Sequence, residues 1–310
     1  MTANLIDGSN IFVICWSVFI RDREIVTDAD SIEFYKIFFM KLKQFLNSEN
    51  NIICFEGKNS KGWRLNIYPD YKAQRESMKD KPNGEYFYKY LEDIKAMLTY
   101  LPCKVIMVEN CEGDDCIYTL ATQISHLPDI DDITIVSGDA DLTQIANFYP
   151  NIRIYHPIKK EYVSPDPNII LYKMLVGDTT DNIKYKKGLG PSTFKKLLEN
   201  KQVWDTWINT EEDYTRLNQI RQIVDLRCCP VEYKNNIITY FNNTVWNEPD
   251  LENFGKYIDN DDYLLSFMNR TCNDYLLKVR RNGHISNLML LRCNNISNDI
   301  YPDYIKGELK

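Results

Sequence analysis

The chain has 310 residues, of which 44% are hydrophobic and 26% are charged. These proportions are typical of a globular protein with a sizeable core and exclude an intrinsically disordered chain, and the length suits one large domain or two modest ones. The net charge of −7 argues only weakly against a nucleic-acid partner, because an acidic protein can still carry a basic groove.

The first half of the chain alternates between strand and helix patterns. Residues 3–6 predict a short buried strand that ends at Asp7, and the apolar run over residues 11–20 predicts a buried helix. Residues 28–46 carry apolar side chains at helical spacing, and residues 51–56 predict a second strand that ends on Glu56. Further helices are expected over residues 85–100 and 113–125, and further strands over residues 104–108, 133–137 and 152–155.

This alternation predicts an α/β fold with a mainly parallel central sheet flanked by helices. The pattern changes near residue 165, and from there to about residue 289 it is helical without clear strands. We therefore predict two parts, an α/β core over residues 1–165 and a helical part over residues 166–310.

Cysteine and histidine usage bears on the compartment and on the metal chemistry. The nine cysteines are odd in number and form no Cys-x-x-Cys pair, which favours a reducing, cytoplasmic compartment. The three histidines lie far apart, so a zinc site is not expected. The apolar run over residues 11–20 is too short to span a membrane.

Carboxylates follow the ends of the predicted strands. Asp7, Glu56 and Asp139 each come just after a strand, and Glu112 lies a few residues past another. The carboxyl ends of parallel strands meet at one edge of the sheet, where such folds place their active sites. The acids form three short clusters: Glu112-Gly113-Asp114-Asp115, Gly138-Asp139-Ala140-Asp141 and Gly177-Asp178-Thr179-Thr180-Asp181. We expect these side chains to converge.

So many carboxylates in one place would repel each other unless cations neutralised them. Hard divalent ions prefer oxygen ligands, with magnesium the usual one, and two such ions about 4 Å apart are a recurrent arrangement for displacement at a phosphodiester. A single Asp-x-Asp or Asp-Gly is more often a turn or a helix cap. That structural interpretation is favoured for Asp115 or Asp178 alone, whereas for the whole set it would require several independent coincidences.

A segment rich in glycine and lysine follows Asp181. Gly188-Leu189-Gly190 permits a tight turn that brings backbone amides close to a phosphate, and Ser192 or Thr193 begins a predicted helix whose N-terminus favours an anion. This pattern, over residues 178–198, is typical of a helix-hairpin-helix motif that grips duplex backbone without reading sequence. The candidate contacts are Lys186, Lys187, Gly188, Gly190, Ser192, Lys195 and Lys196. The alternative is an ordinary helical connection with a solvated basic face.

Residues 57–82 interleave cations with aromatic rings. In such segments the cations meet phosphates and the rings stack on bases. The candidate contacts are Lys61, Arg64, Tyr71, Lys72 and Arg75. The alternative is a solvated loop with a few rings packed on the core; both interpretations stay open for Trp63, and nucleic-acid contact is favoured for Lys72 and Arg75.

Together these residues resemble the 5′ nuclease, or flap endonuclease, superfamily, and within it the T-even-type phage ribonuclease H, a 5′-to-3′ exonuclease. The likeness runs from Leu5 to about residue 245. Residues 61–75 resemble the strand-to-arch segment, and residues 112–115 the Glu-x-Asp-Asp signature. Residues 137–141 are similar to Ser-x-Asp-x-Asp, and residues 177–182 to Gly-Asp-x-x-Asp-Asn. Glu56 stands where many members have aspartate.

The resemblance implies a PIN-like 5′ nuclease core with an arch over residues 57–82, and two Mg²⁺ ions for which Mn²⁺ can substitute. Lys72 and Arg75 would be catalytic residues that contact the scissile phosphate from the arch, and Gly188 and Gly190 would hold duplex backbone with a bound K⁺ ion. The first metal ion would be bound or oriented by Asp7, Glu56, Glu112, Asp114 and Asp139, and the second by Asp115, Asp141, Asp178 and Asp181.

The activity so implied is magnesium-dependent hydrolysis of phosphodiesters near the 5′ ends of branched, nicked or RNA-primed duplex DNA, including removal of RNA primers during lagging-strand replication. The implied partners are DNA and RNA–DNA duplexes with a 5′ flap or a recessed 5′ end, a single-strand DNA-binding protein and a sliding clamp, in the cytoplasm of a phage host.

Two alternatives belong to other functional classes. A non-catalytic protein of the same fold that binds branched nucleic acid would lack a metal ligand. A phosphatase of small molecules would need neither the hairpin nor the basic segment. The sequence does not separate flap cleavage, exonuclease action and primer removal from one another.

Overall fold

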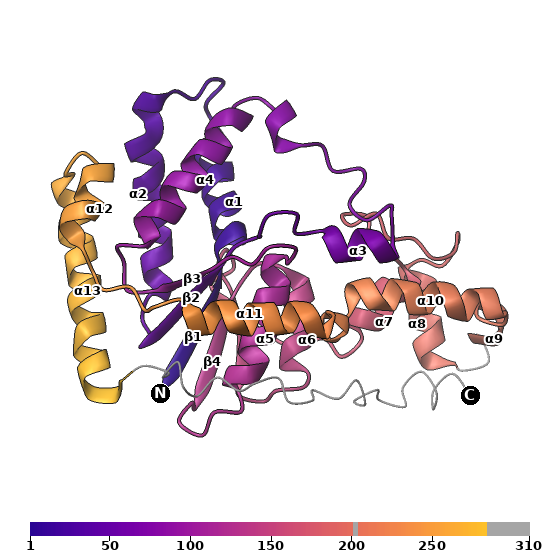
Figure 1. Ribbon diagram of the computed structural model, residues 1–310. Helices are drawn as coiled ribbons and strands as arrows, with labels where there is room; N and C mark the ends of the chain where they lie inside the picture. Colours follow the sequence, from indigo (N-terminus) through magenta and orange to yellow (C-terminus); the bar gives the residue numbers. More distant parts are fainter. Residues whose placement is uncertain (201–203, 284–310) are drawn as a thin grey trace.

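The computed structural model describes residues 1–200 and 204–283. At its centre lies a six-stranded sheet in the order β3-β2-β1-β4-β5-β6 (Figure 1). Strands β1 to β5 run parallel to their neighbours, and β6 runs antiparallel to β5. The strands are β1 (Thr2–Asp7), β2 (Asn50–Cys54), β3 (Lys104–Ile106), β4 (Asp132–Val136), β5 (Ile152–His156) and β6 (Glu161–Val163).

The predicted α/β fold with a mainly parallel sheet is confirmed. Its central strands read as nearly continuous apolar runs because helices cover both of their faces. Ile6 on β1 lies opposite Ile53 on one side and Val136 on the other, and all three are buried. The edge strand β6 was not predicted from the sequence, because its three residues are largely exposed and carry no apolar pattern.

One face of the sheet is covered by α1 (Gly8–Phe19), α2 (Ser31–Leu42) and α4 (Gly84–Leu98), whose aromatic rings form the largest apolar cluster. Phe12 packs edge-on against Phe34 and Phe87, with ring centroids 5.2 and 5.0 Å apart. The helix predicted over residues 28–46 is three consecutive elements, with the short turns η1 (Asp28–Asp30) and η2 (Lys43–Phe45) on either side of α2.

The other face is covered by α5 (Gly113–Ile124), α6 (Thr143–Ala146) with the turn η4 (Ala140–Leu142) before it, and α11 (Val231–Asn243). Ile117 and Leu120 of α5 pack in the same cluster as Ile237 and Phe241 of α11. The helix α11 is joined to the preceding helices through η6 (Leu226–Cys228).

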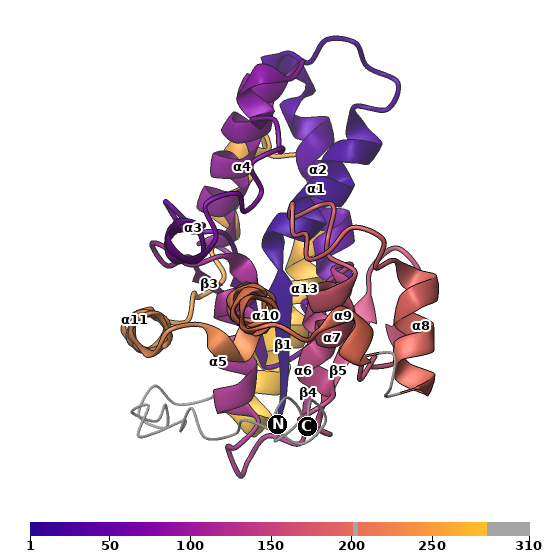
Figure 2. The ribbon, with the colours of Figure 1, turned by 90° about the vertical axis from the view of Figure 1, so that its right-hand side faces the viewer.

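A third apolar cluster lies beside the sheet and joins α3 (Gly62–Ile67) to α7 (Ile169–Leu175), α8 (Pro191–Glu199), α9 (Trp204–Trp207) and α10 (Glu211–Val224) (Figure 2). Tyr68 and Tyr71, from the segment predicted as an arch, are buried in this cluster together with Leu175 and Ile220. The rest of that segment passes through the turn η3 (Met78–Asp80) to α4.

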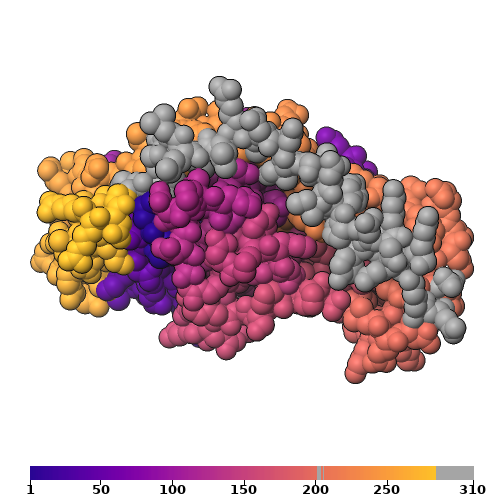
Figure 3. Space-filling view, turned by 90° about the horizontal axis from the view of Figure 1, so that it is seen from below, coloured from indigo at the N-terminus to yellow at the C-terminus, as the bar shows by residue number. Residues whose placement is uncertain are grey.

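The helices after residue 230 return to the sheet. Whereas α11 covers one face, α12 (Leu251–Tyr257) and α13 (Asp262–Asn282) pack in the aromatic cluster of the other. Figure 3 shows α13, in yellow, and the salmon-coloured residues of α8–α10 at opposite ends of the molecule. The part predicted as helical, residues 166–310, is therefore divided between the third cluster and the sheet, and residues 284–310 lie outside the described residues. No helix of the described residues is long and apolar enough to cross a membrane.

Candidate active site

A polar cleft lies at the carboxyl ends of β1, β2 and β4, bounded on its far side by α7 and by the turn that follows it. Strand alternation places the acids here, because parallel strands end at one edge of the sheet. The cleft is lined by seven carboxylates, from Asp7, Glu56, Glu112, Asp114, Asp139, Asp141 and Asp181, and by the cations of Lys72, Arg75 and Lys173.

The first group of acids is held by hydrogen bonds at the start of α1 and after β4. Asp7 caps α1 by accepting from the backbone N–H of Asn10 at 2.9 Å, and its other oxygen accepts from the Ser137 hydroxyl at 2.8 Å. Burial, together with the charges of Asp139 and Glu56, raises the pKa of Asp7 to about 6. The carboxylates of Asp7, Glu56 and Asp139 therefore repel one another, and there is too little positive charge between them to offset the repulsion.

Asp114, in the first turn of α5, shares this deficit. Burial raises the pKa of Asp114 well above its usual range, and the neighbouring charges of Asp139, Asp7 and Glu112 raise it further. Oxygen ligands crowded in this way, with their ionised forms disfavoured, are the donor set that suits a hard divalent cation.

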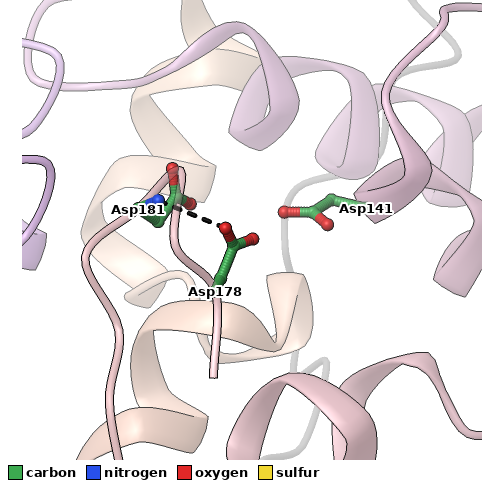
Figure 4. A group of neighbouring side chains, drawn as sticks. All are labelled: Asp141, Asp178 and Asp181. Atoms are coloured by element: carbon green, nitrogen blue, oxygen red, sulfur yellow. Dashed lines mark hydrogen bonds between the residues drawn. The ribbon is translucent and has the colours of Figure 1, made fainter. Parts of the chain in front are cut away.

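The second group consists of Asp141, Asp178 and Asp181, each of which offers a carboxylate oxygen within 4.8 Å of the others (Figure 4). Gly177 makes the turn possible: its φ is +91°, and an added Cβ would lie 2.4 Å from the carbonyl oxygen of Ile183. Burial raises the pKa of Asp141 to about 6. Burial would also raise the pKa of Asp178, but hydrogen bonds from Lys173 and Thr180 lower it to about 2.

Lys72 and Arg75 reach the cleft from the segment after α3. The Lys72 ammonium lies 2.6 Å from Glu112 and 3.9 Å from Asp181, and the Arg75 guanidinium lies 2.8 Å from Asp181. The backbone N–H of Lys72 also donates to the carbonyl of Asp181 at 2.9 Å, and Gln74 donates to Thr179 at 2.6 Å. The segment is thus fastened to the turn that carries the second group.

The structure places Asp115 and Arg64 differently from our sequence-based prediction. Asp115 is fully buried, and its two oxygens accept from the two terminal nitrogens of Arg64, at 2.8 Å each. The Arg64 side chain is only 2% exposed at the cleft wall and also pairs with Glu112 at 3.2 Å. Arg64 is therefore not available to a nucleic acid, and Asp115 is paired behind the cleft; both position Glu112.

Tyr71 needs the same correction. Its ring is buried in the third apolar cluster, and its hydroxyl donates to Glu112 at 2.9 Å, so it cannot stack on a base. Trp63, for which the sequence favoured neither interpretation, is also buried, with its indole N–H 3.4 Å from Asp115. Lys61 lies half-buried at the start of α3. Only Lys72 and Arg75 of this segment's predicted contacts line the acidic cleft without being wholly enclosed.

The predicted hairpin begins at the cleft, which Thr180 and Asp181 line, and its glycine and lysine residues 186–196 lie outside the cleft, around the N-terminus of α8. Gly190 caps α8, and Gly188 has a φ of +91° that a residue with a side chain rarely adopts. Lys186 is less free than predicted, because its ammonium pairs with Asp213 and donates to the carbonyl of Trp207 at 2.7 Å. The other predicted contacts here are exposed: Lys187, Gly188, Ser192, Lys195 and Lys196.

Three residues of this site were not among the site residues predicted from the sequence. Lys173 carried no signal, since a lone lysine on a helix is usually solvated. Ser137 and Asn10 link the two halves of the first group: the Ser137 hydroxyl bonds Asp7, and the Asn10 amide oxygen accepts from the backbone N–H of Gly138 at 2.9 Å. Their positions, three residues after Asp7 and two residues before Asp139, could have identified them.

Comparison with known proteins assigns the chain to a protein family. Residues 2–174 match the family described as the 5′-3′ exonuclease, N-terminal resolvase-like domain. The chain is 25% identical over 230 residues to the ribonuclease H of Enterobacteria phage T4, which covers 66% of this chain and 73% of that protein. It is 29% identical over 180 residues to a 5′-3′ exonuclease of Mycoplasmopsis pulmonis, covering 52% of this chain and 54% of the relative. The match to DNA polymerase I of Rhizobium leguminosarum, 30% over 175 residues, covers 53% of this chain and 16% of the polymerase.

Solved structures share the fold. A bacteriophage T5 protein co-crystallised with metal ions aligns with a TM-score of 0.56 and 15% identity, over 89% of this chain and all of the other. The T5 flap endonuclease in a complex with DNA and metal ions aligns with a TM-score of 0.55 and 16% identity over the same shares. At these identities the likeness supports the fold alone.

Proposed function

This chain belongs to the 5′-3′ exonuclease family and is a nuclease, and from that premise we propose that it hydrolyses phosphodiesters near the 5′ ends of branched, nicked or RNA-primed duplexes with the help of two Mg²⁺ ions. The observation that carries the proposal is the convergence of seven carboxylates in one cleft beside Lys72 and Arg75. Removal of RNA primers during replication is the use we propose for this activity.

The donor set fits hard divalent ions. Asp7, Glu56, Glu112, Asp114 and Asp139 would hold or orient one ion, and Asp141, Asp178 and Asp181 the other. When bound, such ions stabilise the charge that develops on the attacking and leaving oxygens of a phosphodiester. We omit Asp115 from the second set, since Arg64 already occupies both of its oxygens.

The chain's own cations would complete the site. Lys72 and Arg75 would orient the scissile phosphate and stabilise its charge, because a positioned cation favours the transition state more than the ground state. Buried Tyr71 and Arg64 hold Glu112 in place, so that the carboxylate and Lys72 keep their relative positions. The non-catalytic alternative would require a missing acid, and every acid of the signatures is present.

Further partners are proposed from the resemblance. They are DNA and RNA–DNA duplexes with a 5′ flap or a recessed 5′ end, a single-strand DNA-binding protein, a sliding clamp, and a K⁺ ion at the turn of Gly188 and Gly190. The absence of disulfides among the described cysteines suits the reducing cytoplasm that we propose as its compartment, that of the host if the protein is phage-encoded.

Digestion of matched 5′-labelled substrates tests the proposed function. We expect cleavage near the junction of a 5′-flap duplex, of a nicked duplex and of an RNA-primed duplex in Mg²⁺, because the cleft and the hairpin together suit a duplex beside a free 5′ end. The control is a 3′-flap duplex of the same sequence. Equal cutting of the 3′ flap, or no cutting of any substrate, would reject the assignment.

Replacing Lys72 separates chemistry from binding. Lys72→Ala is expected to lower the single-turnover cleavage rate by about 10²–10³, the usual loss when one charge-stabilising group is removed. Duplex affinity should change little, because it rests on the distant hairpin. Lys79→Ala, an exposed lysine of the same segment, serves as the control. A Lys72→Ala protein with a normal rate and weakened affinity would make this segment a simple electrostatic contact.

Salt dependence tests the hairpin. The slope of log affinity against log salt is negative, and each lysine that neutralises a DNA phosphate makes it steeper by roughly 0.9. We expect Lys187→Ala to flatten this slope and Lys186→Ala to change it less, because Lys186 is already paired with Asp213. These neighbours form a matched pair, and Lys195→Ala and Lys196→Ala extend the series. An unchanged slope in the combined Lys187, Lys195 and Lys196 variant would show that duplex is held elsewhere.

A further inference from the structure

Lys173 projects from α7 into the second group of carboxylates. Its ammonium pairs with Asp141 and lies 2.6 Å from Asp178, and its side chain is only 12% exposed. Asp141 and Asp178 are two of the three acids that come within 4.8 Å of one another (Figure 4). A monovalent cation of the chain therefore already lies where these acids could hold a metal ion.

Lys173 engages the Asp178 oxygen that the local hydrogen bonds leave for a metal ion. The Oδ1 atom of Asp178 accepts from the backbone N–H groups of Thr180 at 2.7 Å and Asp181 at 3.2 Å, and from the Thr180 hydroxyl. Its Oδ2 atom is the one turned toward Lys173. On Asp141, Lys173 pairs with Oδ1, whereas Arg75 and Lys72 engage Asp181 instead.

We propose that Lys173 is a built-in counter-ion that competes with the second metal ion for Asp141 and Asp178, so that this ion binds weakly until an anion pairs with the displaced ammonium. The inference rests on the proposed function, which supplies the metal ion and, as the anion, a phosphodiester of the DNA substrate. Ammonium and divalent ion cannot share these oxygens without repulsion, while the flexible lysine stem allows the ammonium to move to a nearby phosphate.

This competition links metal loading to substrate. If DNA pairs with Lys173, it strengthens binding of the second ion, and by reciprocity the second ion strengthens binding of DNA. In the part of the chain that the structure describes, no lysine or arginine forms an ion pair with Asp7, Asp114 or Asp139, and Lys72, whose charge acts on Asp114, pairs with Glu112. The two metal ions are therefore expected to differ in affinity in the substrate-free protein.

Calorimetric titration of the substrate-free protein with Mn²⁺ tests the proposal. We expect the wild-type protein to bind one ion well and a second weakly, and Lys173→Gln to bind the second ion at least roughly tenfold more tightly, a change of about 1.4 kcal/mol. Lys173→Arg keeps the charge and should behave like wild type. Lys256→Gln, a matched loss of charge at an exposed position of α12, should have no effect. Unchanged first-site affinity in Lys173→Gln reports that the variant is folded.

A second titration uses Ca²⁺ and a nicked duplex, with binding read from heat rather than cleavage. DNA should tighten the second site strongly in wild type and only slightly in Lys173→Gln, where no ammonium remains to be displaced. Equal second-site affinity in wild type and Lys173→Gln, while the protein still cleaves 5′-flap DNA, would overturn the role of Lys173 alone. If the wild-type protein cleaves no DNA but Lys173→Gln still binds the second metal ion more tightly, the proposed function would be overturned and the counter-ion role of Lys173 would stand.

Discussion

Removal of divalent ions is expected to abolish cleavage of a 5′-flap duplex completely, and Mg²⁺ or Mn²⁺ is expected to restore it. Seven carboxylates line the cleft, and burial, together with the charges of neighbouring carboxylates, raises the pKa of Asp7 to about 6 and that of Asp114 well above its usual range. A phosphodiester entering this cleft without metal ions would meet repulsion in place of stabilisation.

The measurement is single-turnover cleavage of a 5′-labelled flap duplex in excess chelator, followed by addition of each ion. Ca²⁺, which has the same charge, should restore DNA binding but not cleavage. The circular dichroism spectrum is expected to be the same with and without chelator, because three apolar clusters stabilise the fold and metal binding in the cleft is not needed for it. Robust cleavage in excess chelator would rule out a metal-dependent mechanism.

The sheet and the acids at its edge could be predicted from the sequence because the signal is local. Buried parallel strands read as apolar runs, and the residue at which each run ends is the residue that reaches the carboxyl edge. Asp7 and Asp139 were located in this way: Asp7 is the last residue of β1, and Asp139 lies three residues after the end of β4. The turn at the hairpin glycines could also be predicted, because such turns favour glycine and Gly188 adopts a positive φ.

Pairing between distant charges could not be predicted. Arg64 and Asp115 lie 51 residues apart in the sequence. Arg64 was predicted to contact nucleic acid and Asp115 to bind a metal ion, but the two side chains are buried and hydrogen-bond to each other. A basic residue on a polar segment is exposed far more often than buried, so its sequence alone favours the surface. The pairing of Lys186 with the distant Asp213 was likewise not visible in the sequence, and neither was that of Lys173 with the nearby Asp178.

The return of α11–α13 to the sheet was also beyond the sequence. These helices have apolar faces that any partner could cover, and only the assembled fold decides which one does. Phe241 of α11 packs on the α5 side, whereas Phe254 of α12 lies 5.0 Å from the ring of Phe39 on the opposite side. Where a helical part begins can be predicted from the change in pattern; where its helices dock cannot.

Asp139→Asn is expected to leave the fold and DNA binding intact while nearly eliminating cleavage. Asp139 follows β4 and is exposed in the cleft, and its Oδ1 atom caps η4 by accepting from the backbone N–H of Asp141 at 2.8 Å. An asparagine keeps that accepting oxygen and the shape of the side chain but removes the charge. Only a role that requires the charge, such as holding a metal ion, should therefore be lost.

The rate is expected to fall by at least about 10², because the charge acts where the transition state is stabilised. DNA affinity should survive or increase, since one fewer negative charge repels the phosphates. Asp132→Asn provides a matched control, because Asp132 begins the same strand at its opposite end and forms a surface ion pair with Arg153.

The most direct test of a catalytic carboxylate cleft is therefore the single-turnover cleavage rate of Asp139→Asn on a 5′-flap duplex in Mg²⁺, measured at an enzyme concentration that saturates binding in Ca²⁺. A rate at least about 10² below that of wild type and of Asp132→Asn, with undiminished affinity, is the result that this account predicts. A near-normal rate, or a loss of binding that matches the loss of cleavage, would contradict it and leave Asp139 a structural residue.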